Sequence, residues 1–425
     1  MKKMLIMGTC HGTKAIIEYA KSIGIYTIVT DYNPPEKSAG KRLADEFWMI
    51  STSDLDVLEK KCREEAIDAV ISGVSDFNQE MTLMLCNRLG LPCYCTKEAW
   101  HYSRDKSDFK ALCRRVGAPI PEDYFISAEL TKEELDSVKF PVVVKPVDLS
   151  GNRGVSYCYN KDDLVKAYRY AQSVSKSDRI IVERMLCGEE WYGTYAIAEG
   201  EVSLLALNAM YAQPGEPKNC YTVTTTATRY VEKYINEINE SVINVLKAVG
   251  CTEGIAWVQV MLDEDGHFYI IEMGYRMDGE LAVLPYKNVC NFDAIKWMVE
   301  TSLGIKHKAT ELPNSQKTAF VSCGTGMELW TNKSGRVVEM KGYEEVARIP
   351  GVYVETGIRV GDEIGQYRPA GVITFATNDC EELCDMIDKV NNTIQVINEH
   401  GQDVVIKYTD FEYLREVYAL GLSGQ

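Results

Sequence analysis

The sequence lacks several features that define particular classes of protein. Its 46 lysine and arginine residues are outnumbered by 62 aspartate and glutamate residues, giving a net charge of −16. We expect no nucleic-acid partner, because binding a polyanion needs a clustered basic surface. No apolar run approaches the ~18 residues of a membrane span, and the apolar start ends at Gly8, too early for an export signal. These absences predict a cytoplasmic protein with no membrane partner.

The 14 cysteines show no paired framework. A chain of 425 residues can bury a core large enough to need no disulfide staples. Cys93 and Cys95 suggest a metal site when taken alone, but no second Cys/His pair follows at a spacing typical of zinc. We interpret the cysteines as structural thiols in a reducing compartment.

The first hundred residues alternate short apolar runs with helical patterns. Strands are predicted over 3–7, 26–30 and 69–72, and a helix over 14–22. This alternation is typical of a parallel sheet wound with helices, so 1–100 is interpreted as a Rossmann-like domain of α/β class. Gly8 and Gly12 at the first turn leave a NAD-dependent dehydrogenase as an alternative. The full G-x-G-x-x-G pattern is absent, which favours a tight turn.

The pattern changes after residue 100 and again after residue 310. Helices are predicted over 103–116, 162–174 (opened by an acidic cap) and 231–249, and strands over 141–145, 154–159, 179–183, 191–198, 202–209, 255–262 and 267–273. The last two strands form a hairpin around Asp265-Gly266. This mixture predicts an α+β domain over 101–310. A linker over 311–315 and a helix over 381–398 predict a small accessory α+β domain over 311–425 that packs against the site.

Two lysines and a glycine-rich segment are spaced as a phosphate site requires. Lys106 follows Asp105, and Lys145 ends an apolar strand, where an ammonium group should face an anion. Ser150, Gly151 and Gly154 belong to a segment whose backbone N–H groups can fold over phosphates with little obstruction. A hairpin turn with a surface lysine is the alternative.

The segment after the strand over 179–183 suits a purine base. It combines the acceptor Glu183 with Arg184 and the apolar Met185 and Leu186, and adenine needs both apolar contacts and a short polar edge. Glu190 is a candidate acceptor for ribose hydroxyls. A solvated acidic turn is the alternative for Glu190.

The predicted hairpin supplies candidate metal ligands. Gln259 and Glu272 lie on its two strands, where their oxygens can face one site, and such ligands suit Mg²⁺, with Mn²⁺ as a substitute. Arg276 would then reach the same cleft and hold a substrate carboxylate or a tetrahedral intermediate. The alternative is a surface salt bridge between Glu272 and Arg276.

In order and spacing, these residues resemble the ATP-grasp superfamily across essentially the whole chain. The resemblance implies a Rossmann-like domain, a central ATP-grasp fold and a small C-terminal domain. It also implies that Lys106 and Lys145 grip the phosphates of ATP, that Ser150 to Gly154 form the flap, that Glu183 to Leu186 form the adenine hinge, and that Glu190 binds ribose.

One position departs from the family pattern of an acid or glutamine followed by Glu-x-Asn-x-Arg. Gly274 stands where the asparagine is usual. The L-amino-acid ligases of the bacilysin type are similar in this respect, and Asp278-Gly279-Glu280 looks like their substrate loop. The chain also resembles the carbamoyl-phosphate synthase large subunit and ATP-grasp enzymes of purine biosynthesis.

These observations lead to the hypothesis of an ATP-dependent carboxylate-amine ligase. It would join small-molecule carboxylate and amine substrates, with amino acids preferred, through an acyl phosphate, with Arg276 and Lys145 as catalytic residues. Two alternatives stay open: a ligase of the purine-biosynthetic or carbamoyl-phosphate type, and a nucleotide-binding pseudoenzyme or scaffold, suggested by Gly274. Segments 221–228 and 75–76 are candidates for the acceptor pocket, with a plain strand or helix cap as the alternative. A homodimer is the default expectation.

Overall fold

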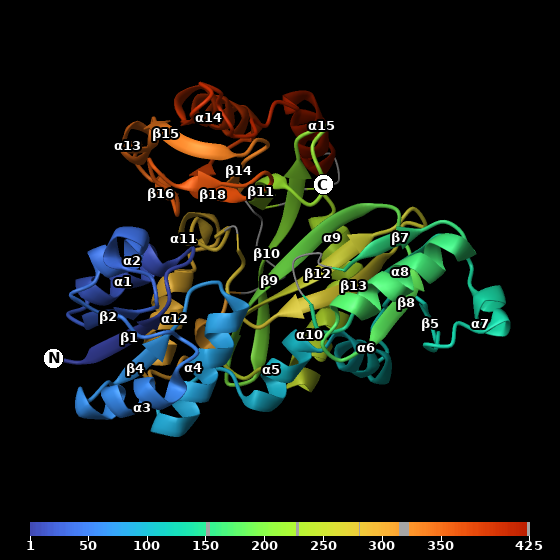
Figure 1. Ribbon diagram of the computed structural model, residues 1–425, viewed down its shortest axis with the longest axis horizontal. Coiled ribbons are helices and arrows are strands. Elements are labelled where there is room, and N and C mark those ends of the chain that lie inside the picture. Colours follow the sequence, from blue (N-terminus) through green and yellow to red (C-terminus); the bar gives the residue numbers. More distant parts are fainter. Residues whose placement is uncertain (150–153, 227–228, 280, 314–322, 423–425) are drawn as a thin grey trace.

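The computed structural model describes residues 1–149, 154–226, 229–279, 281–313 and 323–422 (Figure 1). The described strands form four sheets, of which a three-stranded one lies in the C-terminal part of the chain. A parallel sheet lies at the N-terminal end of the chain, a small antiparallel sheet lies on the far side of the molecule, and a long antiparallel sheet runs between them and up into the C-terminal part. No helix among the described residues has the length and apolar character needed to cross a membrane.

The N-terminal sheet has the order β3-β2-β1-β4, with all neighbours parallel. Its strands are β1 (Lys3–Met7), β2 (Tyr26–Thr30), β3 (Glu46–Trp48) and β4 (Ala69–Ile71), accompanied by the helices α1 (Thr13–Ser22), α2 (Ala39–Leu43), α3 (Leu55–Glu64) and α4 (Asp76–Leu89). Two apolar clusters, one containing Met4 and Ile6 and the other Leu5 and Met7, cover opposite faces. The predicted wound parallel sheet is thereby confirmed.

The first turn of this sheet binds a carboxylate of the protein itself. Gly12 has a φ of 85°, which glycine tolerates, and its N–H donates to Glu355 Oε2 at 3.0 Å. Glu355 belongs to β16 (Tyr353–Glu355) in the C-terminal part of the chain. The amide that a dinucleotide phosphate would use at this turn therefore already has an anionic partner.

The helix predicted over 103–116 is two helices. α5 (Lys97–Arg104) ends and α6 (Lys106–Arg115) begins at Asp105, whose backbone is extended and whose carboxylate accepts from the Asp108 N–H at 2.9 Å. An aspartate cap stabilises a new helix start more than it favours helix continuation. As a result, Lys106 stands at the first position of α6.

The small antiparallel sheet has the order β5-β8-β6-β7. It consists of β5 (Asp123–Tyr124), β6 (Val142–Pro146), β7 (Ser156–Cys158) and β8 (Ile180–Arg184), with α7 (Lys132–Ser137) nearby and α8 (Lys161–Val174) packed on its outer face (Figure 1). The predicted acidic cap of α8 is wrong. The cap is Asn160, which accepts from the Asp163 N–H at 3.0 Å.

The long sheet has the order β13-β12-β9-β10-β11-β14-β18-β16. Its first five strands are β9 (Glu189–Ala198), β10 (Glu201–Ala212), β11 (Tyr221–Thr226), β12 (Gly254–Leu262) and β13 (Phe268–Gly274). The predicted hairpin of β12 and β13 is confirmed. The helical run predicted over 231–249 is also confirmed, as α9 (Val231–Tyr234), a π turn and α10 (Glu240–Val249), and it ends at Gly250 with a φ of 87°. α11 (Tyr286–Val289) and α12 (Ala294–Ser302) follow.

The C-terminal residues continue this sheet and add a second one. β14 (Cys323–Trp330) pairs with β11 and is followed by β18 (Pro369–Thr377) and β16, while β15 (Gly335–Lys341), β17 (Glu363–Ile364) and β19 (Gln395–Asn398) form a three-stranded sheet. The helices are α13 (Tyr343–Ala347), α14 (Cys380–Thr393) and α15 (Phe411–Leu422). The helix predicted to reach residue 398 stops at Thr393, because the β-branched Ile394, Val396 and Ile397 favour the strand β19.

Candidate active site

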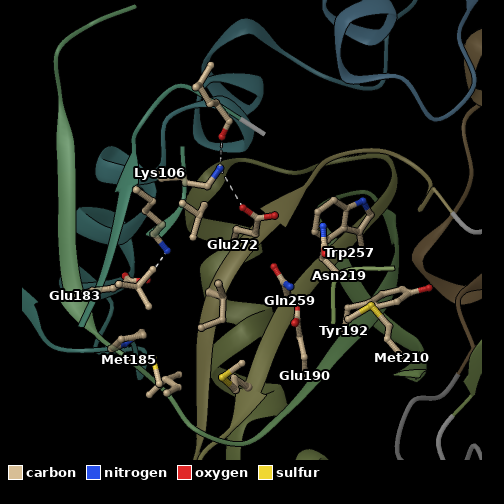
Figure 2. Close-up of a pocket in the computed structure, with 18 of the residues that line it drawn as sticks. Lys106, Glu183, Met185, Glu190, Tyr192, Met210, Asn219, Trp257, Gln259 and Glu272 are labelled. Atoms are coloured by element: carbon tan, nitrogen blue, oxygen red, sulfur yellow. Dashed lines mark hydrogen bonds and ion pairs between the residues drawn. The ribbon is translucent and has the colours of Figure 1, made fainter. Parts of the chain in front are cut away.

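A cavity of about 390 Å³ lies between the small antiparallel sheet and the β12–β13 hairpin. One wall comes from β6, β7 and β8 and the other from β9, β10, β11, β12 and β13. Its lining includes Lys106, Lys145, Glu183, Arg184, Met185, Leu186, Glu190, Tyr192, Met210, Asn219, Tyr221, Trp257, Gln259, Met261, Glu272, Arg276, Asp278 and Gly279. Figure 2 shows Glu183 and Met185 on one side and Trp257, Asn219, Tyr192 and Met210 on the other, with Gln259, Glu190 and Glu272 between them.

A buried ion cluster forms the base of the first wall. Lys145 on β6 and Lys110 on α6 both pair with Glu183 on β8, and Lys110 also pairs with Asp123. β6 and β8 are adjacent antiparallel strands, and Val143 stands opposite Glu183 in their register, so Lys145 is two residues along from that pair. One carboxylate is therefore shared by two ammonium groups.

The cluster controls the protonation of its members. Burial alone would raise the pKa of Glu183, but the charges of Lys145 and Lys110 outweigh it and hold that pKa below its ordinary value. Burial lowers the pKa of Lys110 to about 8, although Glu183 opposes this shift. Glu183 is thus ionised at neutral pH, and Lys110 is the member whose charge is most easily lost.

The Lys106 ammonium group connects the two walls. Its Nζ donates to the Leu149 carbonyl oxygen at 2.9 Å and lies 3.1 Å from Glu272 Oε2 (Figure 2). Glu272 stands directly opposite Gln259 in the β12–β13 register. The register shifts after Gln259, and this bulge lets the neighbouring Ile271 reach the cavity as well.

This pair fits the predicted metal site. A glutamine and a glutamate offer oxygen donors from two adjacent strands, and Glu272 is already paired with a cationic group. These are the donors that a hard divalent ion such as Mg²⁺ prefers.

Trp257 explains the glycine at position 274. The two residues stand opposite each other in the β12–β13 register, and a Cβ on Gly274 would lie closer than 3.0 Å to three atoms of the indole. Because the backbone of Gly274 needs no positive φ, the space taken by the indole is what restricts this position. An aromatic side chain therefore occupies the place of the usual asparagine.

Arg276 is held between three groups. Its Nε pairs with Asp76 of α4, its Nη1 donates to the Met277 carbonyl oxygen at 2.7 Å, and its guanidinium carbon lies 5.3 Å from the centre of the Trp257 ring. The charge of Arg276 holds the pKa of Asp76 below its ordinary value although burial acts in the opposite direction. Asp76, a candidate for the acceptor pocket, thus reaches the site through Arg276, while Ser75 caps α4 and accepts from the Asn78 N–H at 3.3 Å.

Glu190 is half-buried in the wall between the two ends of the cavity. It accepts a hydrogen bond from the Tyr221 hydroxyl, which comes from the candidate segment 221–228. Burial raises the pKa of Glu190, and the Tyr221 hydrogen bond opposes that shift. A neutral or weakly acidic Glu190 can still exchange hydrogen bonds with sugar hydroxyls.

The structure does not describe several of the predicted residues, and one described residue lies outside the cavity lining. Ser150 and Gly151, together with residues 152, 153, 227, 228 and 280, are outside the described part of the chain. Gly154 has a φ of 78° and is packed so that a Cβ would lie 2.8 Å from Pro146 Cγ and 2.9 Å from Val174 Cγ2. The position of Gly154 is therefore explained by packing. The assignment of individual ligand contacts to the predicted residues stays a prediction.

Some residues in or directly behind the cavity lining were missed, although the sequence carried a signal for them. Lys110 follows Lys106 by four residues, which places both on one helix face. Trp257 and Met261 flank Gln259 at a spacing of two and so share its face of β12. Asn219, Tyr192 and Met210 had no comparable signal, because their position depends on strand pairings between distant segments.

Comparison with known proteins agrees with this architecture. Residues 138–283 match the family model of the ATP-grasp domain. The chain is 24% identical over 337 residues to the carbamoyl phosphate synthase large chain, N-terminal section, of Aquifex aeolicus (strain VF5). This match covers 74% of the chain but only 59% of that relative.

Solved structures match over nearly the whole chain. An L-amino acid ligase from Bacillus licheniformis superimposes with a TM-score of 0.76 at 19% identity, covering 94% of this chain and 99% of that one. The biotin carboxylase domain of the Hydrogenobacter thermophilus 2-oxoglutarate carboxylase, solved with MgADP, ADP and bicarbonate, gives a TM-score of 0.77 at 18% identity, covering 98% and 94%. These likenesses confirm the mixed α/β fold, and the family model places the ATP-grasp domain at residues 138–283.

Proposed function

We propose that this ATP-grasp chain is an ATP-dependent ligase that joins a carboxylate to an amine, with an amino acid as the acid. The observation that carries the proposal is the convergence of Lys145, Lys106 and the Gln259–Glu272 pair on one cavity. Cations on one side and oxygen donors on the other suit a nucleoside triphosphate with its metal ion. The family match over 138–283 and the likeness to an L-amino acid ligase support it.

The nucleotide would lie with its base against Met185 and Leu186 and its ribose beside Glu190. Lys145 and Lys106 would then bind the phosphate oxygens and neutralise charge that builds up during phosphoryl transfer. Gln259 and Glu272 would hold Mg²⁺, which supplies further neutralisation of the phosphates. The rest of the reaction depends on positioning by the protein's own side chains.

Two bond exchanges complete the reaction. An oxygen of the substrate carboxylate attacks the terminal phosphorus of ATP, and the bond to ADP breaks, which gives an acyl phosphate. The amine nitrogen then attacks the acyl carbon, phosphate leaves, and the nitrogen loses a proton to give the amide. Arg276, fixed by Asp76 and by the Trp257 ring, would orient the carboxylate and stabilise the oxyanion of the second step.

The structure also bears on the pseudoenzyme alternative. Gly274 suggested that alternative because an oxygen ligand is missing, yet Trp257 fills the same place and contacts Arg276. Gly274 and Trp257 are therefore complementary in size, and the site stays packed. The departure at position 274 does not remove Gln259, Glu272 or either lysine.

A phosphate-release screen tests the proposal. Purified protein is mixed with ATP, Mg²⁺ and pairs of amino acids, and positive pairs are analysed by mass spectrometry. The expected result is amino-acid-dependent formation of ADP and of a product with the mass of both acids less one water. Binding of ATP without any acid-dependent turnover across the screen would contradict the proposal.

A further inference from the structure

The carboxylate of Asp278 is a buried charge at the wall of the cavity. Asp278 is only 3% exposed, lines the cavity and follows Arg276 by two positions. Oδ1 accepts a hydrogen bond from the Ala282 N–H at 2.9 Å. Oδ2 is also buried and accepts no hydrogen bond of standard geometry among the described residues, although the Tyr192 hydroxyl is close enough to lower the pKa of the carboxyl group. One oxygen is thus held by the Ala282 amide, while the other has no ion-pair partner among these residues.

The surroundings of Asp278 do not compensate its charge. Burial raises the pKa of this carboxyl group, and the Ala282 amide, the charge of Arg276 and the Tyr192 hydroxyl offset that effect only in part. Arg276 is itself paired with Asp76. A buried carboxylate with no paired cation is costly, and a cationic group of a ligand would remove that cost.

The neighbouring residues fit the rest of an amino acid. An α-amino acid carries its carboxylate and its ammonium group on one carbon, and Arg276 and Asp278 offer one cation and one anion two residues apart. Trp257, Tyr192 and Met210 gather at this end of the cavity (Figure 2), where they form an aromatic and apolar wall for a side chain. Glu183 and Met185, assigned to the base, lie on the opposite side.

We infer that Asp278 binds the α-ammonium group of the acid substrate and thereby selects an α-amino acid over a plain carboxylic acid. This inference rests on the proposed ligase function and assigns substrate selection to one residue of the site. Phosphorylation of the carboxylate leaves the ammonium group intact, so the ion pair persists through the acyl phosphate.

The test uses hydroxylamine to trap the acyl phosphate. Hydroxylamine attacks the acyl carbon and releases phosphate, so hydroxamate formation reports the first half-reaction without an amine substrate. The wild type and Asp278→Asn are assayed with the best amino acid of the screen and with the acid of the same side chain that lacks the amino group, such as L-phenylalanine and 3-phenylpropanoate. Asparagine keeps the shape and can still accept from the Ala282 N–H.

The expected result is a selective loss. Removing one partner of a buried ion pair should lower kcat/KM for the amino acid about 100-fold, with the value for the plain acid changed only a few-fold. KM for ATP should stay at the wild-type value. Asp162→Asn, the same substitution at an exposed position in the first turn of α8, is the matched control and should leave both acids unaffected. Equal losses for both acids, or no loss for the amino acid, would overturn the inference.

Calorimetry separates this inference from the proposed function. If the wild type traps no hydroxamate from any acid, the ligase proposal fails. Titration of the amino acids of the screen into the wild type and Asp278→Asn still decides the role of Asp278. Binding that is lost in the variant supports an ammonium site, whereas equal binding, or no binding to the wild type, refutes it.

Discussion

The Trp257–Gly274 pair gives a prediction that can be worked out from the structure. A methyl group at position 274 would lie closer than 3.0 Å to Cε2, Cζ2 and Nε1 of the Trp257 indole. Overpacking of this kind typically costs about 1–3 kcal/mol. We therefore expect Gly274→Ala to lower the free energy of unfolding by about 2 kcal/mol, within that range.

The effect of Gly274→Ala on the free energy of unfolding should change sign once the indole is removed. In a Trp257→Ala background the methyl group meets no ring, and alanine within a strand is favoured over glycine by about 0.5–1 kcal/mol. Gly274→Ala should then be neutral or stabilising. The coupling energy between the two sites, from the difference between these effects, is about 2 kcal/mol or more.

Urea unfolding of the four proteins, followed by circular dichroism, measures this coupling. Gly357→Ala is the matched control, because a Cβ there meets nothing within 4 Å and the backbone needs no positive φ. It should change stability by less than about 1 kcal/mol. If Gly274→Ala is equally destabilising with and without the indole, the packing explanation for Gly274 is wrong.

Three further predictions concern the nucleotide and its metal. Lys145→Ala and Glu272→Ala should each lower ATP turnover at least ~100-fold while the circular dichroism spectrum stays that of the wild type, because each removes a charge that acts on the phosphates or their metal ion; full turnover in either variant would contradict the assignment. The pKa of Lys110 is lowered to about 8, so this lysine is charged below pH 8 and neutral above it. Above pH 8 Lys145 would be the remaining charged partner of Glu183 in this pair of lysines and would be less available to ATP, so KM for ATP should rise in the wild type but stay constant in Lys110→Arg. Parallel pH profiles of the two proteins would refute this prediction. Tyr221→Phe removes a hydrogen bond that lowers the pKa of Glu190, so Glu190 should become ionised at a higher pH. The pH at which KM for ATP changes should therefore move upward. An unchanged pH profile of KM would show that Glu190 does not take part in nucleotide binding.

The elements that could be predicted from the sequence are those set by local patterns. β1 and β2 of the parallel sheet are short runs rich in apolar and β-branched residues, and the β12–β13 hairpin has a turn sequence with few alternatives. The break between α5 and α6 was missed because helical periodicity continues across Asp105, whereas the cap decides the boundary. The strand β19 was missed because its β-branched residues follow a helix without a turn signal.

The candidate site likewise contains residues that local sequence patterns predict and pairings that they do not. Lys106, Lys145, Gln259 and Glu272 could be proposed because their residue types and order are informative on their own. The buried cluster of Glu183 with Lys145 and Lys110 could not, since it depends on the approach of α6 to β6 and β8. The alternative of a surface salt bridge between Glu272 and Arg276 is replaced by pairs of the same long-range kind, because Lys106 and Asp76 come from segments far away in sequence to pair with them.

These pairings bear on how the cavity would accept a highly charged ligand. Lys106 is paired with Glu272, and Lys145 with Glu183, so each predicted phosphate-binding cation already has a carboxylate partner. A nucleotide with its metal ion would offer phosphate oxygens to the lysines and a cation to Glu272, and Lys110 would remain with Glu183. Binding would therefore exchange one set of ion pairs for another, which avoids leaving a buried charge unpaired at any stage. Asp278 differs from these carboxylates, because it is buried without an ion-pair partner among the described residues, and the substrate would have to supply one.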